Sequence, residues 1–536
     1  MRWSSFGHRA GRRVGRHVGR RSPRRKWRRR GRLHGALPLD TRGGSAGAWI
    51  ANAPGVPQTW SHAMSNTWSY DAEQAVAGVL GLVPGVGSLL SALTYILWPS
   101  TDNVWDDIKA QVEALVAQDL SDYETGQIND TLTGLKGVIT EYTTTAGGDD
   151  PSAISATWIS ANTQFIASAP KFQDATYAVL LLPQFAQFAN LHLSLLRDGV
   201  LFGSTWGWTA DYLQQQQQLL TQTLKDYVSY VDTTYQNSFT PLVPGILDSP
   251  LKPPIPPVTA PPYLGSMNAG QALFLWTNTY VRQMTRMVLD FATLWPYFDP
   301  SAYPPPVSIQ LKSEIYSDPI GTAEGWNGLP SAPTQPMSQL TVWGASNIFA
   351  VQATYPQGAG PNGATTTPRL GNPTAGSSTP PLGGTFDVAG NPITTVSVLV
   401  SGGEPFACFF TFQDGSQAIT GDTVAQGMKA TYAYDGQIVS SVFINGVTPD
   451  TGADCIIVGF QYAAASTVSM SVLRTLYVSA PKVSSLPEFL EVVQPDAAGR
   501  KDVAALAEAQ GWEAERAAYQ AGRKARTQGQ GAALAS

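Results

Sequence analysis

The chain has few of the side chains that build metal sites and hydrolytic centres. Of its 536 residues only two are cysteine, Cys408 and Cys455, and only five are histidine. Two cysteines form at most one disulfide and have no zinc-ligand spacing, and only His62 and His192 lie beyond the first 34 residues. No phosphate-binding loop or nucleophile elbow occurs. We therefore expect no enzyme activity, no metal and no cofactor.

Charged residues are also scarce, at 14%, and unevenly placed. Residues 1–42 hold 15 Lys and Arg against one acid, Asp40, whereas the rest has 19 basic and 38 acidic side chains. The Arg/Gly-rich segment 1–45 has no apolar periodicity and no apolar core of a secretory signal, so we expect a disordered arm and no signal peptide. One interpretation is that such an arm binds nucleic acid or anionic lipid. Two others are that it is a protease-labile leader, or that the start codon has been assigned too far upstream and the segment is not translated. The last two readings are favoured.

Residues 66–297 have helical periodicity. The nearly uncharged stretch 68–98 is broken at Pro84-Gly85, and the piece after the break spans only about 20 Å, which favours two packed helices over a membrane span. Amphipathic helices are predicted over 103–122 and 125–145, an uncharged polar one over 151–168, and further helices over 206–237 and 268–295. A proline-rich insert, 239–265, separates the last two.

The segment 174–202 predicts a helix that is apolar on most of its surface, which belongs at the centre of a bundle. Its polar residues fall within about 100° of arc at the helical spacing. They are Gln184, Gln187, Asn190, Ser194, Arg197 and Asp198. His192 falls outside this arc and is predicted to be a hydrogen-bonded core residue. Arg197 and Asp198 are adjacent and cannot face each other, so we expect each to form an ion pair with a neighbouring helix of the bundle.

From 305 to 480 short β-branched runs alternate with Gly, Pro and Asn. Three related segments, beginning at Val342, Val398 and Val442, each predict a strand, a turn and a second strand. Three repeats suggest three sheets packed with pseudo-threefold symmetry. Cys408 and Cys455 occupy comparable strands and are expected to be buried free thiols. The Ala-rich segment 481–536 is expected to form a solvated helix or mobile tail.

Two long blocks resemble the Cry-type three-domain δ-endotoxins. AQFANLHLSLLRDGVLFGSTWGW, residues 186–208, is similar to their central-helix block, and 282–321 is similar to the end of their last helix and the strand that follows. The order of helices and the PGVG break at 84–87 also match. The resemblance covers about 66–321 and implies a multidomain α plus β fold: a seven-helix pore-forming bundle around a central helix, then a three-sheet β-prism that binds receptors.

By the same resemblance, the protein docks on a membrane-anchored receptor or glycan and inserts a helical hairpin, about 151–202, to permeabilise host cells. It is then an insecticidal toxin of bacterial origin, secreted or released, monomeric in solution and oligomeric in the membrane. Loops at one end of the prism would recognise the receptor. The candidate loop residues are Gly344, Asn347, Gly402, Glu404, Asn445 and Asp450.

Several features depart from the family. The third domain does not fit in the 56 residues after Ala480, so we expect it to be absent. Residues 151–168, the helix that precedes the central one, carry no charge. Pro183 lies within the predicted central helix and should kink it. The alternative function is a lectin-like protein that binds glycans or receptors without forming pores. A further alternative is nucleic-acid binding through the Arg-rich arm.

The arm gives the first testable prediction. Trypsin should cut the segment containing Arg32 and Arg42 and leave a resistant core that begins near residue 43, because cleavage concentrates in disordered termini. N-terminal sequencing and mass spectrometry of the digest measure this. Rapid degradation within 66–297 would contradict a compact bundle.

Overall fold

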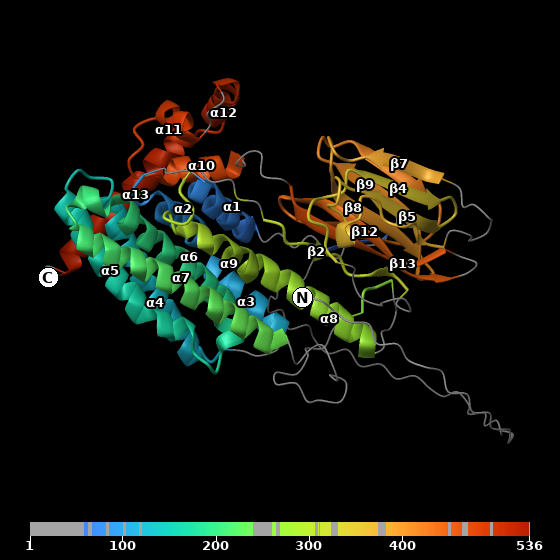
Figure 1. Ribbon diagram of the computed structural model, residues 1–536, viewed down its shortest axis with the longest axis horizontal. Coiled ribbons are helices and arrows are strands. Elements are labelled where there is room, and N and C mark those ends of the chain that lie inside the picture. Colours follow the sequence, from blue (N-terminus) through green and yellow to red (C-terminus); the bar gives the residue numbers. More distant parts are fainter. Residues whose placement is uncertain are drawn as a thin grey trace, which may run out of the picture. The chain divides into compact units, whose positions relative to one another are not determined.

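A computed structural model describes residues 58–534 with gaps (Figure 1). The gaps are 63–66, 82–84, 100–102, 117–119, 240–259, 264–268, 306–308, 310, 323–330, 373–381, 449–451, 464–469 and 494–496. The predicted arm with Arg32 and Arg42, most of the proline-rich insert and Asp450 lie outside the described residues.

The first part of the described chain is a helical bundle. Its helices are α1 (Thr67–Gly81), α2 (Ser88–Leu97), α3 (Val104–Val116), α4 (Asp122–Thr145), α5 (Pro151–Phe172), α6 (Ala178–Phe202), α7 (Ala210–Phe239), α8 (Ala269–Met284) and α9 (Asp290–Leu294). Short helical segments η1 (Gly203–Trp206), η3 (Thr285–Leu289) and η4 (Trp295–Phe298) connect or extend them. The predicted two-helix start and amphipathic helices are present.

Local capping explains where α4 and α5 begin. The Ser121 hydroxyl accepts the amide of Glu124 at the start of α4, and the Asp150 carboxylate accepts the amides of Ser152 and Ala153 at the start of α5. Pro151 occupies the first position of α5, where its missing N–H has no helical partner to lose.

Helix α6 is the centre of the bundle. Twenty of its residues, Leu180 through Gly199, are buried, and its side chains share one hydrophobic core with α1 to α5, α7 and α8. It begins at Ala178, four residues later than predicted, because residues 173–177 form the turn after α5. Gly199 allows close packing, since a Cβ there would lie 2.6 Å from the Trp158 ring of α5.

Three β-sheets follow. One has the order β6–β5–β4–β7, with β4 (Gln339–Gly344), β5 (Ile348–Thr354), β6 (Leu370–Gly371) and β7 (Leu382–Asp387). A second has the order β1–β11–β8–β9–β10, with β8 (Ile393–Ser401), β9 (Glu404–Phe412), β10 (Gln417–Gly421) and β11 (Met428–Ala433). Its edge strand is β1 (Gln58–His62), which comes from before the bundle and runs parallel to β11.

The third sheet pairs β12 (Gln437–Thr448) with β13 (Gly452–Tyr462), and β13 with β2 (Ile315–Tyr316) and β3 (Ile320–Gly321). The three repeats predicted from the sequence are the antiparallel hairpins β4–β5, β8–β9 and β12–β13. Their inward side chains form a second hydrophobic core. Cys408 and Cys455 are buried free thiols, as predicted, and burial raises the pKa of Cys408 to about 12.

A buried polar network joins the bundle to the β-sheets. The Arg282 guanidinium of α8 lies 3.0 Å from the Asp318 carboxylate and donates to the Tyr316 carbonyl at 2.7 Å. Glu73 of α1 accepts a hydrogen bond from Tyr462, whose ring stacks on Tyr70. These contacts come from both ends of the bundle sequence, so the junction depends on α1 and α8 together.

The C-terminal part differs from the sequence prediction. The β region was expected to reach residue 480, but the last strand ends at Tyr462 and residues 470–479 form a helix, α10 (Met470–Ser479). Three helices follow: α11 (Leu486–Val493), α12 (Ala497–Ala509) and α13 (Trp512–Leu534). They are not a free tail, because Leu473, Phe489 and the fully buried Trp512 belong to the core of the bundle. The packing was not predicted because the segment is rich in alanine and its few large buried side chains form no periodic pattern.

The Arg282–Asp318 pair predicts a large stability effect. Replacing Asp318 by Leu should lower the free energy of unfolding by about 3–5 kcal/mol, because it leaves the guanidinium buried without its counterion. The free energy of unfolding should fall by less in the double variant Arg282→Met/Asp318→Leu, because no unpaired charge stays buried. Chemical denaturation followed by circular dichroism measures both.

The control is Lys109→Gln, which breaks a partly exposed pair with Glu113 and should cost less than about 1 kcal/mol. An Asp318→Leu variant as stable as this control would show that the buried pair does not hold the junction.

Candidate functional site

The polar stripe of α6 is fully inside the bundle. The six predicted stripe residues are between 0% and 6% exposed. Asn190 donates to the Gln187 side chain at 3.1 Å and accepts from the Trp295 indole at 2.8 Å, while Ser194 donates to the Asn190 carbonyl. One side-chain atom each of Gln184 and Gln187 has no hydrogen-bond partner among the described residues. The stripe is thus buried with its hydrogen bonding incomplete.

Asp198 ends the stripe and connects three helices. Its carboxylate accepts the backbone amide of Gly87, just before α2, at 2.8 Å, and the Tyr142 hydroxyl of α4 at 2.9 Å. Burial raises its pKa to about 7, although these hydrogen bonds and Arg197 favour the charged form. The group is therefore close to half-ionised at neutral pH.

Arg197 donates to the Leu80 carbonyl at 3.4 Å. Both stripe-end residues find partners on other elements, as predicted, but these partners are hydrogen-bonding groups and not the ion pairs that the sequence suggested. Burial lowers the pKa of Arg197.

His192 is a structural residue, as predicted. Its ring nitrogens lie 2.7 Å from the Tyr227 hydroxyl and 3.0 Å from the Asn162 side-chain oxygen. Its ring stacks on Phe165 of α5 with an angle of 3° between the planes. Burial lowers its pKa to about 3, so it stays neutral at physiological pH.

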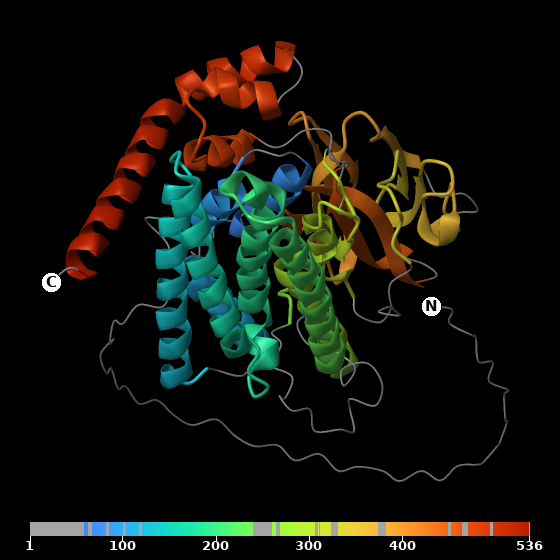
Figure 2. The same ribbon diagram turned by 60° about the vertical axis from the view of Figure 1, so that its left-hand side comes forward.

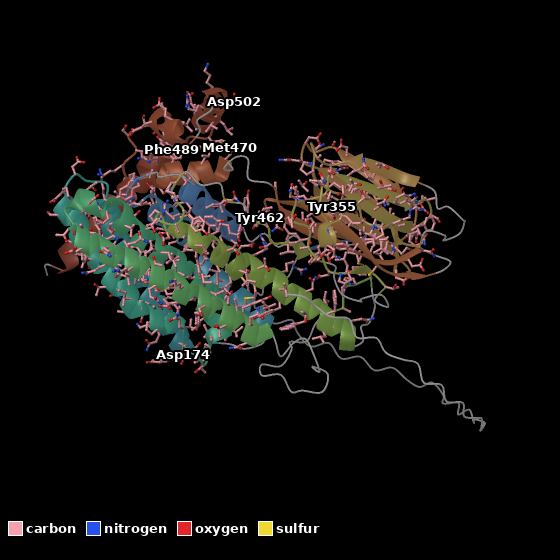
Figure 3. The ribbon with its side chains drawn as sticks, viewed as in Figure 1. Asp174, Tyr355, Tyr462, Met470, Phe489 and Asp502 are labelled. Carbon is pink, nitrogen blue, oxygen red and sulfur yellow. The ribbon has the colours of Figure 1, made fainter. Side chains whose placement is uncertain are left out.

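Helices α5 and α6 are joined as a hairpin. The Trp158 indole of α5 donates to the Leu195 carbonyl of α6 at 2.6 Å, and Asp174 marks the turn between the helices (Figure 3). α5 extends to Phe172 and so includes one cation, Lys171, which donates to Thr131 at 3.1 Å. From 151 to 170 it is uncharged, and its outward positions include the exposed Ile159 and Ile166.

Two of the candidate receptor-loop residues meet in the structure. The Asn347 amide, before β5, donates to the Glu404 carboxylate, at the start of β9, at 3.0 Å. Gly344 ends β4, and Gly402, with φ 59°, lies in the β8–β9 turn. Asn445 lies in β12, where only its backbone is described. Two hairpin tips therefore lie side by side.

The third hairpin tip lies at the same end of the sheets. A Cβ at Gly452, the first residue of β13, would be 2.7 Å from the Ile348 carbonyl. β13 runs from there for 11 residues, about 33 Å, to Tyr462 at the bundle. The tips are thus far from the bundle junction.

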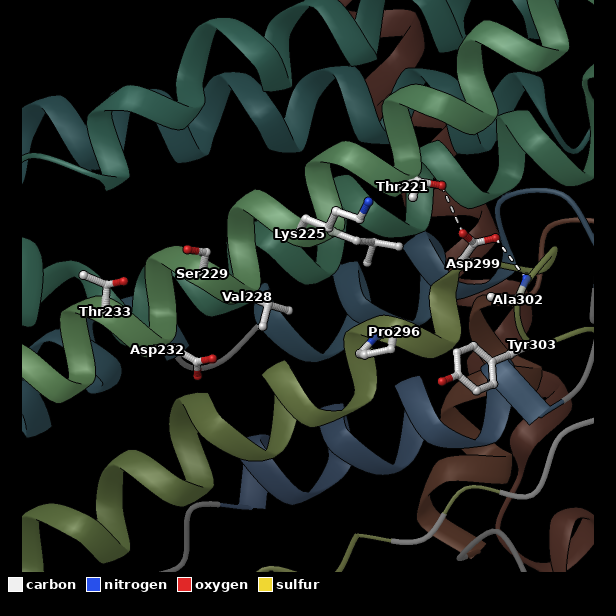
Figure 4. A pocket seen from close by; sticks show the side chains of 11 residues that line it. Thr221, Lys225, Val228, Ser229, Asp232, Thr233, Pro296, Asp299, Ala302 and Tyr303 are labelled. Carbon is white, nitrogen blue, oxygen red and sulfur yellow. Dashed lines mark hydrogen bonds between the residues drawn. The ribbon is translucent and has the colours of Figure 1, made fainter. Parts of the chain in front are cut away.

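A groove of about 550 Å³ lies on the bundle surface between α7 and the segment after η4 (Figure 4). Its floor is mainly apolar, from Leu224, Val228, Pro296 and Tyr303, and Asp299 beside it is held by Thr221 and Gln217. No cluster of three or more metal-ligating side chains occurs within the described ranges.

A buried hairpin with a polar-striped helix, attached to three hairpin-built sheets, defines a class of fold: a helical bundle followed by a second domain of three β-sheets. Comparison with known proteins shows which family the bundle resembles. Residues 75–243 match the family model of the delta endotoxin, N-terminal domain.

Two curated relatives are pesticidal crystal proteins of Bacillus thuringiensis. Cry7Ab of subspecies dakota is 29% identical over 259 residues and Cry1Id is 31% identical over 261, in each case 46% of this chain. The matches cover only 20% and 32% of these relatives, so the chain spans less than a third of their length.

The fold extends the match beyond the helices. A Cry1Da tryptic core variant from Bacillus thuringiensis superposes with a TM-score of 0.59 at 18% identity, covering 75% of this chain and 74% of that one. Residues 75–243 are thus similar to the delta-endotoxin N-terminal domain. The predicted resemblance to Cry-type δ-endotoxins is confirmed, as is the fold of a helical bundle followed by a three-sheet domain.

Sequence reasoning found the stripe but not its partners. Tyr142, Asn162 and Tyr227 hold Asp198 and His192, yet each reads in sequence as an ordinary residue of an amphipathic helix. Each of them lies between 30 and 56 residues along the chain from the α6 residue that it contacts, so no local sequence pattern indicates the contact.

Asp198 generates a prediction about pH. Its folded pKa, about 7, lies above its usual value, so its contribution to stability is full below about pH 4 and is lost as the pH rises through 7. Between about pH 5 and 6.5 it should lower the free energy of unfolding by about 1.4 kcal/mol per pH unit. Asp198→Asn should remove that part of the slope.

The slope is measured by urea titrations at several pH values. Asp290 and Glu314, whose pKa values burial also raises to about 7, and Glu73 contribute in the same direction in wild type and variant alike. Asp130→Asn, at an exposed position, is the control. An unchanged slope in Asp198→Asn would show that Asp198 is ionised throughout.

Proposed function

We propose that this protein is a pore-forming toxin that docks on target-cell membranes through its β-domain and permeabilises them by inserting the α5–α6 hairpin. The observation that carries the proposal is the amphipathic α6, whose polar stripe is buried against other helices with unmet hydrogen bonds. The family relationship supports an insecticidal activity of this kind.

Both helices of the hairpin are long enough. At about 1.5 Å per residue, the 22 residues of α5 span about 33 Å and the 25 of α6 about 38 Å, against about 30 Å of hydrocarbon. The segment 178–206 is the one stretch of the described helices with the length and apolarity of a membrane span, although 94% of its apolar 18-residue window is buried. A core helix passes the same test, so membrane competence is latent.

The stripe determines what the inserted state must look like. Arg197, Asp198 and the two glutamines are too polar to face lipid, where each unmet polar group costs several kcal/mol. They are accommodated only if several hairpins surround water. We therefore propose an oligomeric pore formed from a protein that is monomeric in solution.

Receptor docking is assigned to the three hairpin tips. They gather at one end of the sheets, about 33 Å along β13 from the bundle, so a receptor or glycan bound there leaves the bundle free to open. Asn347 and Glu404 present an amide and a carboxylate suited to polar recognition. The β-domain boundaries 305–462 and the bundle boundaries 66–297 are part of this proposal.

The test is dye release from vesicles with and without target-gut membrane extract, using intact and trypsin-trimmed protein. We expect release by the trimmed protein. For the hairpin, Asp174→Cys labelled with an environment-sensitive dye should brighten on insertion, because the turn enters the membrane. Asp387→Cys, exposed on β7, is the control that should not brighten.

Binding to glycan-bearing membranes without dye release or brightening at residue 174 would instead identify a lectin-like protein. Binding of the Arg-rich arm to nucleic acid would show as an affinity that falls steeply with salt and is lost with the arm.

A further inference from the structure

The C-terminal helices α10–α13 cover one end of the bundle. Leu473, Leu476 and Tyr477 of α10 pack into the bundle core, and Trp512, the first residue of α13, is fully buried. Phe489 of α11 lies at the opposite end of the bundle from Asp174 (Figure 3), and the same helices appear in red beside the bundle in Figure 2. They therefore cover the end from which the α5–α6 turn points away.

Polar contacts attach α13 to two bundle helices. Glu515 accepts hydrogen bonds from Tyr95 of α2 and, at 2.8 Å, from Arg474 of α10. Arg523, only 4% exposed, donates to the Thr143 hydroxyl at 2.8 Å and to the Thr144 hydroxyl at 3.3 Å, both at the end of α4. A buried cation of α13 is thus hydrogen-bonded to the last turn of α4.

The C-terminal helices are held together independently. Arg516 of α13 donates to the carbonyls of Tyr477 and Val483 and lies over the Tyr477 ring, 4.9 Å from its centroid. Gln520 donates to the Ala480 carbonyl at 3.3 Å. These contacts stay within residues 477–520, so they do not depend on the bundle helices.

The last turn of α4 lies between α13 and α6. Thr143 and Thr144 contact Arg523, while the preceding residue, Tyr142, donates to Asp198 of α6. Gly87, the second donor to Asp198, is also beside the C-terminal segment, since a Cβ there would be 3.7 Å from Pro481. Both helices that hold Asp198 are therefore held in turn by residues 481–523.

We propose that α10–α13 form a clamp that keeps α2 and α4 closed over α6, so that the clamp must detach from the bundle before the α5–α6 hairpin can leave it. This regulation rests on the proposed pore function. The clamp acts through α4: while Arg523 holds Thr143 and Thr144, Tyr142 cannot move away from Asp198.

Weakening the clamp should speed pore formation. Arg523→Gln removes the charged donor to Thr143 and Thr144 and should raise the initial rate of dye release at least about tenfold, because charge-assisted hydrogen bonds to α4 are lost. Lys524→Gln removes the same charge at the adjacent, exposed position and should leave the rate unchanged. Equal rates for the two variants would overturn the proposal.

Fixing the clamp should block the pore. Asp149, after α4, and Lys482, after α10, approach to 4.0 Å, and both are exposed, so Asp149→Cys/Lys482→Cys leaves the core intact. A short bifunctional methanethiosulfonate should bridge the two thiols, while the buried Cys408 and Cys455 stay unmodified. The bridged protein should release no dye, and a reductant should restore release; treated single-cysteine variants should match wild type.

Hydrogen exchange of α6, measured with vesicles present, separates the clamp from the pore. If the bridge does not affect dye release, the clamp proposal is wrong and the pore proposal stands. A second outcome is that the bridge suppresses hydrogen exchange in α6 but no variant releases dye. This outcome would support the clamp proposal and contradict the pore proposal. If neither dye release nor bridge-dependent exchange is seen, both are overturned.

Discussion

The structure depends on keeping the polar stripe of α6 away from both water and lipid. An entirely apolar helix would be stable at the centre of a bundle, but α6 also buries polar groups there. Gln184, Gln187 and Arg197 each have one side-chain atom without a hydrogen-bond partner among the described residues. The buried carboxylate of Asp198 accepts two hydrogen bonds. Removal of such groups from water costs free energy, which the surrounding apolar packing offsets. The closed bundle is therefore stable but holds a helix suited to another environment.

Asp198 is the acidic residue of the stripe, and its burial costs free energy when its carboxylate is charged. Its carboxyl is fully buried and accepts from one backbone amide and one tyrosine, and burial places its pKa near 7. Since ionisation weakens the closed state, the packing of α2 and α4 against α6 is sensitive to pH. The C-terminal helices support the same two helices from outside, which gives the closed bundle a second set of restraints.

The β-domain is connected to the bundle through a compact polar junction. Arg282, Asp318, Glu73 and Tyr462 bring together segments from both ends of the bundle and from the strands. Gly436 allows the approach, because a side chain there would meet the Tyr70 ring and its φ of 70° suits glycine. The hairpin tips lie at the far end of β13, so binding at the tips and opening of the bundle involve separate surfaces.

The sequence by itself determined the helices between residues 66 and 297, the three hairpins, the burial of His192 and the position of the polar stripe. These follow from periodicities of 3.6 and 2 residues and from Gly and Pro breaks, which are local properties of the chain. Only the tertiary structure decided that Asp198 is held by Gly87 and Tyr142, that Asn347 meets Glu404, and that residues 470–534 pack on the bundle. Those contacts join residues 56 to 420 positions apart. In addition, the alanine-rich segment has only a few buried anchors, such as Trp512 and Arg523, which produce no periodic pattern in the sequence.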